Sequence, residues 1–177
     1  MALSSCTLIG SIQRDCRDSN GGIIEIKVKV LPSLATLTAD YSVSSGVVSI
    51  ASPSRSTWYT YYFEKQTASF TETLTGNPQQ GTNAYAQEMK VIFNKLSAQI
   101  RNEIQVLSKN PIQIAIRDRN DVYWLAGYEF GMDLTTAISA TGVAMGDRNG
   151  YDLTFAGAER VPMLNLTAAG YSQLITV

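Results

Sequence analysis

The stretch that decides the fold spans residues 58–96 and reads WYTYYFEKQTASFTETLTGNPQQGTNAYAQEMKVIFNKL. Its first part is rich in threonine and aromatic residues, which are enriched in β-strands. The segment 76–83 has the Gly, Asn and Pro content of a turn. We therefore predict a long β-hairpin, with a first strand of up to seventeen residues over 58–74 and a returning strand over 85–96.

The returning strand alternates apolar and polar residues, so its two faces differ in character. The apolar face is predicted to lie in the core or at a subunit interface, and it carries Met89, Val91 and Phe93. The opposite face is polar and carries Glu88, Lys90 and Asn94. Because a mean strand has only about five or six residues, arms of this length are expected to leave their own core and lie against something else.

One helix is predicted after the hairpin, over residues 97–110. Ser97 is a good N-cap residue, and Asn110-Pro111 ends the helical pattern. A single apolar stripe is formed by Leu96, Ile100, Ile104 and Leu107. A stripe this narrow predicts a helix that packs on a sheet from one side.

Most of the remaining chain also has strand character. Residues 23–30 alternate, which predicts a strand with one wet face. Its apolar face would be Ile24, Ile26, Val28 and Val30, and its wet face Glu25, Lys27 and Lys29. The Ser-, Thr- and Ala-rich segment 33–56 is interpreted as an excursion with one short strand pair. The later strands are expected at Ile112–Arg117, Val122–Phe130, around Leu134–Val143, Tyr151–Phe155 and Val161–Leu166. Together these elements predict a single domain over residues 1–177, mainly β with one packed α-helix.

The chain has 177 residues, a net charge of −1 and no histidine. Without histidine, the Ser–His–Asp and Cys–His catalytic sets and the usual catalytic zinc sites cannot be built. We therefore expect no enzymatic activity, no cofactor and no metal. The near-zero net charge argues against a dedicated nucleic-acid binder, because such proteins usually have a basic face. No stretch has the ~20 apolar residues of a membrane span.

Three residue groups have both a functional and a structural interpretation. Asp118, Asn120 and Asp121 partly match a calcium loop, but the required Gly and the distant Glu are missing, so a hairpin turn is favoured. The aromatic run 59–63 is interpreted as packing or a subunit interface rather than a stacking platform, because no Arg or Lys is interleaved. The two cysteines, at positions 6 and 16, either form a disulfide or, as we favour, remain separate thiols.

A monomer would leave the apolar face of the hairpin and its strand edges exposed. Exposed edges pair with neighbouring chains, and large apolar patches mark interfaces. Both problems are resolved in a ring in which neighbouring hairpins pair edge to edge into a closed barrel. One face of the hairpin would then be buried, and the other would face a lumen.

Several segments between about residues 16 and 166 carry a resemblance to a known family. They are Gly21-Gly22-Ile23 after Cys16, YFEKQTASFTE at 62–72, Gly81-Thr82, the helix from Ser97, YWLAG at 123–127 and GYDLTFAGAE at 150–159. With these segments the sequence resembles the tail tube proteins of long-tailed bacteriophages, in particular small tail proteins of phages of Bacteroidetes-type hosts. The order of a long hairpin, one helix and closing strands is similar to the tube fold.

The resemblance implies a structural virion protein that forms stacked, hexameric rings around a channel for DNA. It would be made in the host cytoplasm and reside in the virion tail. Its partners would be further copies of itself, other phage tail proteins, and DNA that passes without sequence-specific binding. Residues 33–56 and the termini would reach neighbouring rings. The lumen would be lined by Glu64, Gln66, Glu72, Glu88, Lys90 and Asn94.

Two other functions remain open at this level. A tail terminator or neck ring protein of the virion would share the fold but form a single ring. A β-sandwich adhesin or carbohydrate-binding module would be a monomer that uses the aromatic residues 58–63 on an exposed surface.

Overall fold

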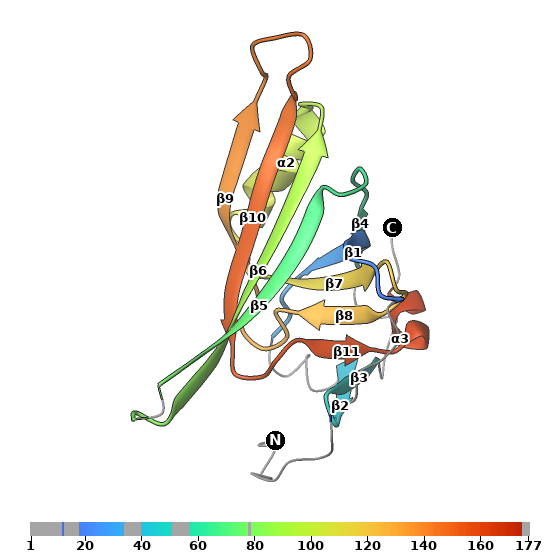
Figure 1. Ribbon diagram of the computed structural model, residues 1–177, viewed down its shortest axis with the longest axis vertical. Helices are drawn as coiled ribbons and strands as arrows, with labels where there is room; N and C mark the ends of the chain where they lie inside the picture. The colour runs from blue at the N-terminus through green and yellow to red at the C-terminus, as the bar shows by residue number, and fades with distance from the viewer. Residues whose placement is uncertain (1–11, 13–17, 34–39, 51–56, 78, 175–177) are drawn as a thin grey trace.

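The structure is a computed structural model that describes residues 12, 18–33, 40–50, 57–77 and 79–174. Two β-sheets pack face to face (Figure 1). In spatial order, the first sheet consists of β2 (Tyr41–Ser44), β3 (Val47–Ile50), β11 (Leu164–Leu166), β8 (Tyr123–Ala126), β7 (Ile112–Asp118), β1 (Ile23–Val30) and β4 (Tyr59–Tyr61). The second consists of β5 (Ala68–Asn77), β6 (Thr82–Asn94), β10 (Gly150–Glu159) and β9 (Asp133–Ala140). The predicted fold class, mainly β with one packed helix, is confirmed.

The space between the two sheets is filled by the first core cluster. It is apolar because alternating residues of both sheets point into the same layer. The seven-stranded sheet contributes residues of β1 and β7, and the four-stranded sheet contributes residues of β6 and β10. The main members are Ile26, Val28, Ile112, Ile114, Ile116, Met89, Val91, Leu153 and Phe155.

The prediction of the first strand of the hairpin is wrong, because residues 58–74 do not form one continuous strand. Tyr59–Tyr61 pairs with β1 in the seven-stranded sheet, whereas β5 begins only at Ala68 in the other sheet. Between them the chain turns at Gln66, whose φ is 65°, and the hydroxyl of Thr67 donates to the carbonyl oxygen of Glu64 at 2.6 Å. The hairpin that forms is therefore β5–β6, which projects beyond the body of the molecule at one end (Figure 1).

The second face of β1 is covered, so the prediction of a wet face there is wrong. This face borders a second core cluster, whose main members are Val48, Trp58, Ala115, Leu125, Leu166, Tyr171 and Leu174. Lys27 lies over the Tyr171 ring and its Nζ donates to the carbonyl oxygen of Leu174 at 3.0 Å. Lys29 is buried beside the Trp58 ring. The aliphatic stems of both lysines thus take part in packing.

The predicted apolar face of β1 is also only partly right. A register irregularity between Ile23 and Glu25 shifts the alternation at the start of the strand. Ile23 is consequently buried and Ile24 exposed, while Ile26 and Val28 are buried as predicted and Val30, at the end of the strand, is exposed. A bulge of this kind moves the residues on either side of it to different faces.

The helix α2 (Ala98–Leu107) begins where the sequence predicts and ends earlier than the expected residue 110. The hydroxyl of Ser97 accepts the N–H of Ile100 at 3.2 Å, as an N-cap residue does. The residues of the expected stripe all contact the first core cluster: Leu107 is buried, and Leu96, Ile100 and Ile104 are partly buried. A second helix that was not predicted, α3 (Ala168–Ser172), covers the second core cluster.

Two loop predictions fall partly outside the described residues. Within 33–56, β2 and β3 form the expected short strand pair, and β3 is joined in parallel to β11 at the edge region of the seven-stranded sheet. The two cysteines lie outside the described residues. The segment 118–122 is the predicted hairpin turn, because Asp118 accepts the N–H groups of Asn120 and Val122 between β7 and β8.

Candidate assembly surface

The four-stranded sheet has one buried face and one face that no other described element covers. Its buried face packs on the first core cluster. Directly opposite residues of an antiparallel pair lie on the same face, so the register defines both faces. Lys90 is opposite Ser69 on one side and Thr154 on the other, and Thr154 is opposite Thr136. This row, together with Glu88, Thr71, Asp152 and Asn94, defines what we call the outer face.

The outer face is largely polar, with small side chains and paired charges, but Ile92 and Ile138 also lie on it, on either side of Asp152 in the register. Lys90 Nζ lies 2.7 Å from a carboxylate oxygen of Glu88, and both side chains are exposed. At the end of the sheet, Arg148 pairs with Asp152 through two hydrogen bonds. Neither pair leaves a surplus of positive charge, so this surface has little attraction for a polyanion.

Of the six residues predicted to share one polar surface, three lie together. Glu88, Lys90 and Asn94 share the outer face of β6. Glu64 and Gln66 are instead part of the connection that precedes β5. These two therefore do not belong to the hairpin surface, because the chain leaves the seven-stranded sheet before β5 begins.

Glu72 lies on the opposite face from Glu88, which corrects the predicted arrangement. It is opposite Gln87 in the register, and its Oε2 accepts the side-chain N–H of Gln87 at 2.9 Å. The same oxygen accepts the N–H of Met163 at 2.6 Å. Glu72 is thus held, partly buried, as a hydrogen-bond acceptor that ties β5 to the segment before β11.

The residues expected at the core or at a subunit interface belong to the core of this chain. Met89 and Val91 are fully buried, and Phe93 is partly buried against the same cluster. Phe93 contacts the Tyr61 ring edge to face, with centroids 5.9 Å apart. These side chains are therefore occupied within one subunit.

The outer strands β5 and β9 are the two edges of this sheet. The N–H of Ile92 donates to the carbonyl oxygen of Thr67, next to the opposed pair Ala68 and Val91. In an antiparallel ladder this pattern points the N–H and C=O groups of Ala68, and of every second residue after it, away from β6. No strand among the described residues pairs with either edge, so backbone groups of β5 are available to another chain.

One end of the sheet is fixed by buried polar side chains that the sequence did not indicate. Glu159, at the end of β10, is buried and accepts the backbone N–H groups of Glu129, Phe130 and Gly131. Burial raises the pKa of the Glu159 carboxyl, although these backbone hydrogen bonds act in the opposite direction. Gln87 is likewise buried, and its Oε1 accepts the N–H of Gly127 at 2.9 Å. Both residues hold the β8–β9 connection against the sheet.

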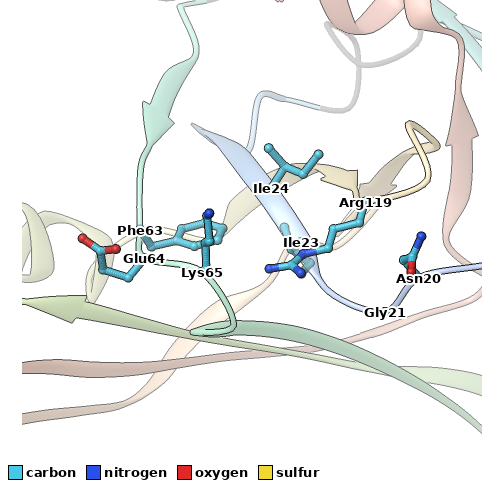
Figure 2. A pocket seen from close by; sticks show the side chains of 8 residues that line it. All are labelled: Asn20, Gly21, Ile23, Ile24, Phe63, Glu64, Lys65 and Arg119. Atoms are coloured by element: carbon cyan, nitrogen blue, oxygen red, sulfur yellow. The ribbon is translucent and has the colours of Figure 1, made fainter.

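A separate pocket of about 560 Å³ lies beside the start of β1. Figure 2 shows Arg119 extending across Ile23 toward Lys65 and Phe63, while the Glu64 carboxylate points away. Lys65 and Arg119 have no ion pair with any residue that the structure describes. The pocket thus combines two cations with an apolar floor, and it lacks a nucleophile with an adjacent base.

Comparisons of the chain with protein-family models, with curated proteins and with solved structures gave no match. Among the described residues no group of three or more acidic or cysteine side chains is placed to hold a metal ion. No helix in the part of the chain that the structure describes is long and apolar enough to cross a membrane. The arrangement of the four-stranded sheet is therefore the feature from which a function is argued.

Proposed function

We propose that the chain is a structural subunit that assembles into rings, and that the stacked rings form the hollow tail tube of a long-tailed bacteriophage. The observation that carries the proposal is the four-stranded sheet with one buried face, one polar exposed face and two unpaired edges. The resemblance of the sequence to tail tube proteins supports the same assignment.

Edge-to-edge pairing satisfies the backbone groups that a single subunit leaves open. The β5 edge of one copy pairs with the β9 edge of the next, and a closed ring removes every edge. With ~4.8 Å between strands, six such sheets give a barrel roughly 40 Å across between backbones. This diameter leaves room for a DNA duplex inside the side chains that line the wall.

The outer face becomes the wall of the channel in this arrangement. Glu88 and Lys90 neutralise each other there, as do Arg148 and Asp152. Each phosphate contact with an unpaired cation would add to the affinity for DNA. Beside these pairs the wall carries Ser and Thr side chains and two isoleucines, Ile92 and Ile138, which offer no charge to the phosphates, so DNA would pass without being held.

The partners follow from this role. They are further copies of the chain within and between rings, other proteins of the phage tail, and DNA in transit. The chain would act in the virion tail, without catalysis and without a cofactor.

Electron microscopy of the purified full chain tests the proposal. We expect hollow rings or tubes about 100 Å across, the size that compact-domain scaling gives for six subunits of this length. Light scattering after size-exclusion chromatography should show a mass that rises with protein concentration. A monomer that is unchanged at every concentration would overturn the proposal.

The same images separate the tube from the other ring-forming roles. Single rings that never stack would support a tail terminator or neck ring instead. A glycan-binding module is less well supported by the contacts of its aromatic residues. Tyr61 packs on Phe93 and donates its hydroxyl hydrogen to Glu103 at 2.6 Å, and Phe63 is partly buried. Only Tyr59 and Tyr62 of that run remain exposed.

A further inference from the structure

The pocket beside the start of β1 opens where two paired strands part. β4 pairs with residues 26–28 of β1, and on that side no strand among the described residues pairs with residues 23–25. After Tyr61 the chain leaves the sheet toward β5, so Phe63 and Lys65 form the opposite wall of the pocket. The pocket volume of about 560 Å³ lies within the range of small-molecule sites in proteins.

Two cations line this pocket without a carboxylate to neutralise them. Neither Arg119 nor Lys65 has an ion pair or a side-chain hydrogen bond among the residues that the structure describes. Glu64, the acidic residue among the described lining residues, directs its carboxylate away from them (Figure 2). Two like charges without a counter-ion repel each other, and an anion placed between them removes this repulsion.

The floor between the two cations is apolar. Ile23 is buried, Ile24 is 43% exposed, and Phe63 is partly buried against the first core cluster. Such a floor favours a ligand with an apolar body, because contact removes apolar surface of both partners from water. A hydrated inorganic ion such as phosphate would leave the floor uncovered.

Hydrogen bonds fix the wall that carries Arg119. The side-chain N–H of Asn120 donates to the carbonyl oxygen of Asn20 at 2.9 Å, and its Oδ1 accepts the N–H of Asn20 at 2.7 Å. The carbonyl oxygen of Gly22 accepts the N–H of Arg119 at 3.1 Å. A Cβ atom at Gly22 would lie 3.0 Å from Nε of Arg119, so the glycine leaves room for the arginine side chain along the backbone.

The wall that carries Lys65 is a tight turn. Gln66 has a φ of 65°, and the hydroxyl of Thr67 donates to the carbonyl oxygen of Glu64. A positive φ at a residue other than glycine is strained, and strain of this kind is concentrated at sites that hold ligands. Both walls are thus preorganised, which lowers the entropic cost of binding.

We propose that this pocket binds an organic carboxylate that has an apolar body. The carboxylate lies between the two cations, where the planar guanidinium of Arg119 donates two parallel hydrogen bonds and Lys65 supplies a second positive charge. The apolar body covers Ile23, Ile24 and Phe63. Inorganic phosphate would match only the charge of the pocket, and an uncharged hydrocarbon only its floor. All of these residues belong to one subunit, so the proposal does not depend on ring formation.

Equilibrium dialysis of the whole chain against 2-naphthoate tests the class of ligand. We expect saturable binding with a Kd of roughly 1 mM or lower, the range that typical ligand efficiency gives for a probe of this size. 2-Naphthamide has the same shape without the charge, and acetate has the charge without the apolar body. Each should bind at least about tenfold more weakly than 2-naphthoate. Equal binding of 2-naphthamide, or displacement of 2-naphthoate by an equal concentration of inorganic phosphate, would overturn the proposal.

Variants of the two cations assign the binding to this pocket. Arg119→Gln and Lys65→Gln should each weaken the binding of 2-naphthoate by about tenfold, and Arg119→Lys should lose less, because it keeps the charge without the planar fork. Lys109→Gln is the matched control, since it removes an exposed cation at the opposite end of β7 from Arg119, and it should bind as the wild type does. Circular dichroism and thermal melting check that each variant is folded. Unchanged affinity of folded Arg119→Gln or Lys65→Gln, or an equal loss in Lys109→Gln, would overturn the proposal.

Discussion

At the scale of single residues, Glu159 joins the end of β10 to the β8–β9 connection. Three backbone N–H groups converge on its carboxylate, and the residue is 2% exposed. Gly157 on the same strand approaches Gly131 so closely that a Cβ atom there would lie 2.5 Å from the Gly131 carbonyl oxygen. A carboxylate acceptor and a glycine together allow the connection to pass directly over the strand.

Glu159→Ala should destabilise the fold by about 2–4 kcal/mol, because it leaves buried N–H groups without acceptors. Urea denaturation followed by circular dichroism measures this change in the free energy of unfolding. Glu159→Gln keeps one acceptor oxygen and should cost less than Glu159→Ala. Equal stability of Glu159→Ala and wild type would show that water replaces the carboxylate.

The raised pKa of Glu159 predicts a pH dependence with a definite sign. The folded carboxyl holds its proton to a higher pH than the unfolded one, whose usual pKa is 4.5. The free energy of unfolding of the wild type therefore decreases as the pH rises through the range just above 4.5. Glu159→Gln lacks this component, so its stability relative to wild type should increase with pH over that range. A constant difference between the two proteins in urea titrations from pH 4.5 to 7 would contradict the prediction.

At the scale of elements, the sequence predicts those strands and helices whose pattern is local. Ser97 and the stripe from Leu96 to Leu107 define α2, and the alternation of 85–94 defines β6. The break between β4 and β5 has no such signal. Gln66 adopts a positive φ that usually favours glycine, and tertiary packing of Tyr61 and Phe63 on the core decides where the strand ends.

The sequence also did not show that the second face of β1 is covered. Lys27 and Lys29 alternate with apolar residues, which usually indicates a solvated face. Here residues of β3 and α3, distant in sequence, cover that face. A local pattern cannot show that coverage, because a lysine stem packs on rings as well as it extends into water.

A proline substitution tests whether the free edge of β5 pairs with another copy of the chain. Leu74 is one of the residues whose N–H points away from β6, so Leu74→Pro removes a hydrogen-bond donor only from the open edge. We expect a folded subunit that no longer forms rings, as measured by light scattering. Leu74→Val keeps the N–H and is the control, which should assemble normally. Rings formed by Leu74→Pro would show that β5 is not a pairing edge.

At the scale of the whole molecule, the sequence indicated a polar hairpin face but not its full composition. The sequence correctly predicted that Glu88, Lys90 and Asn94 lie on one face of the returning strand. It could not include the contributions of β9 and β10, because which strands flank the hairpin depends on long-range pairing. The complete outer face is a property of four strands, and its charge balance is visible only when they are assembled.

Charge reversal on the outer face tests its proposed neutrality toward DNA. Glu88→Lys with Thr154→Lys leaves a cluster of unpaired cations around Lys90. Assembled variant protein should bind duplex DNA at low salt and lose it steeply as salt increases, with about one phosphate contact per added lysine. Wild-type assemblies should bind far less in a filter-binding assay, and Glu88→Gln, which leaves only Lys90 unpaired, should lie between the two. Equal binding by wild type and the lysine variant would contradict a role for this face in DNA passage.

The β5–β6 hairpin has a consequence for how copies are aligned. Tyr85 is the last residue of β6 opposite β10, so Thr82–Ala84 and their partners in β5 extend past the end of the sheet. The two edges of the sheet therefore end at different heights. A neighbouring copy that slid along the edge by one residue would turn its side chains to the wrong face. In the proposed ring, the projecting end of the hairpin would therefore oppose slippage of one copy along the edge of the next.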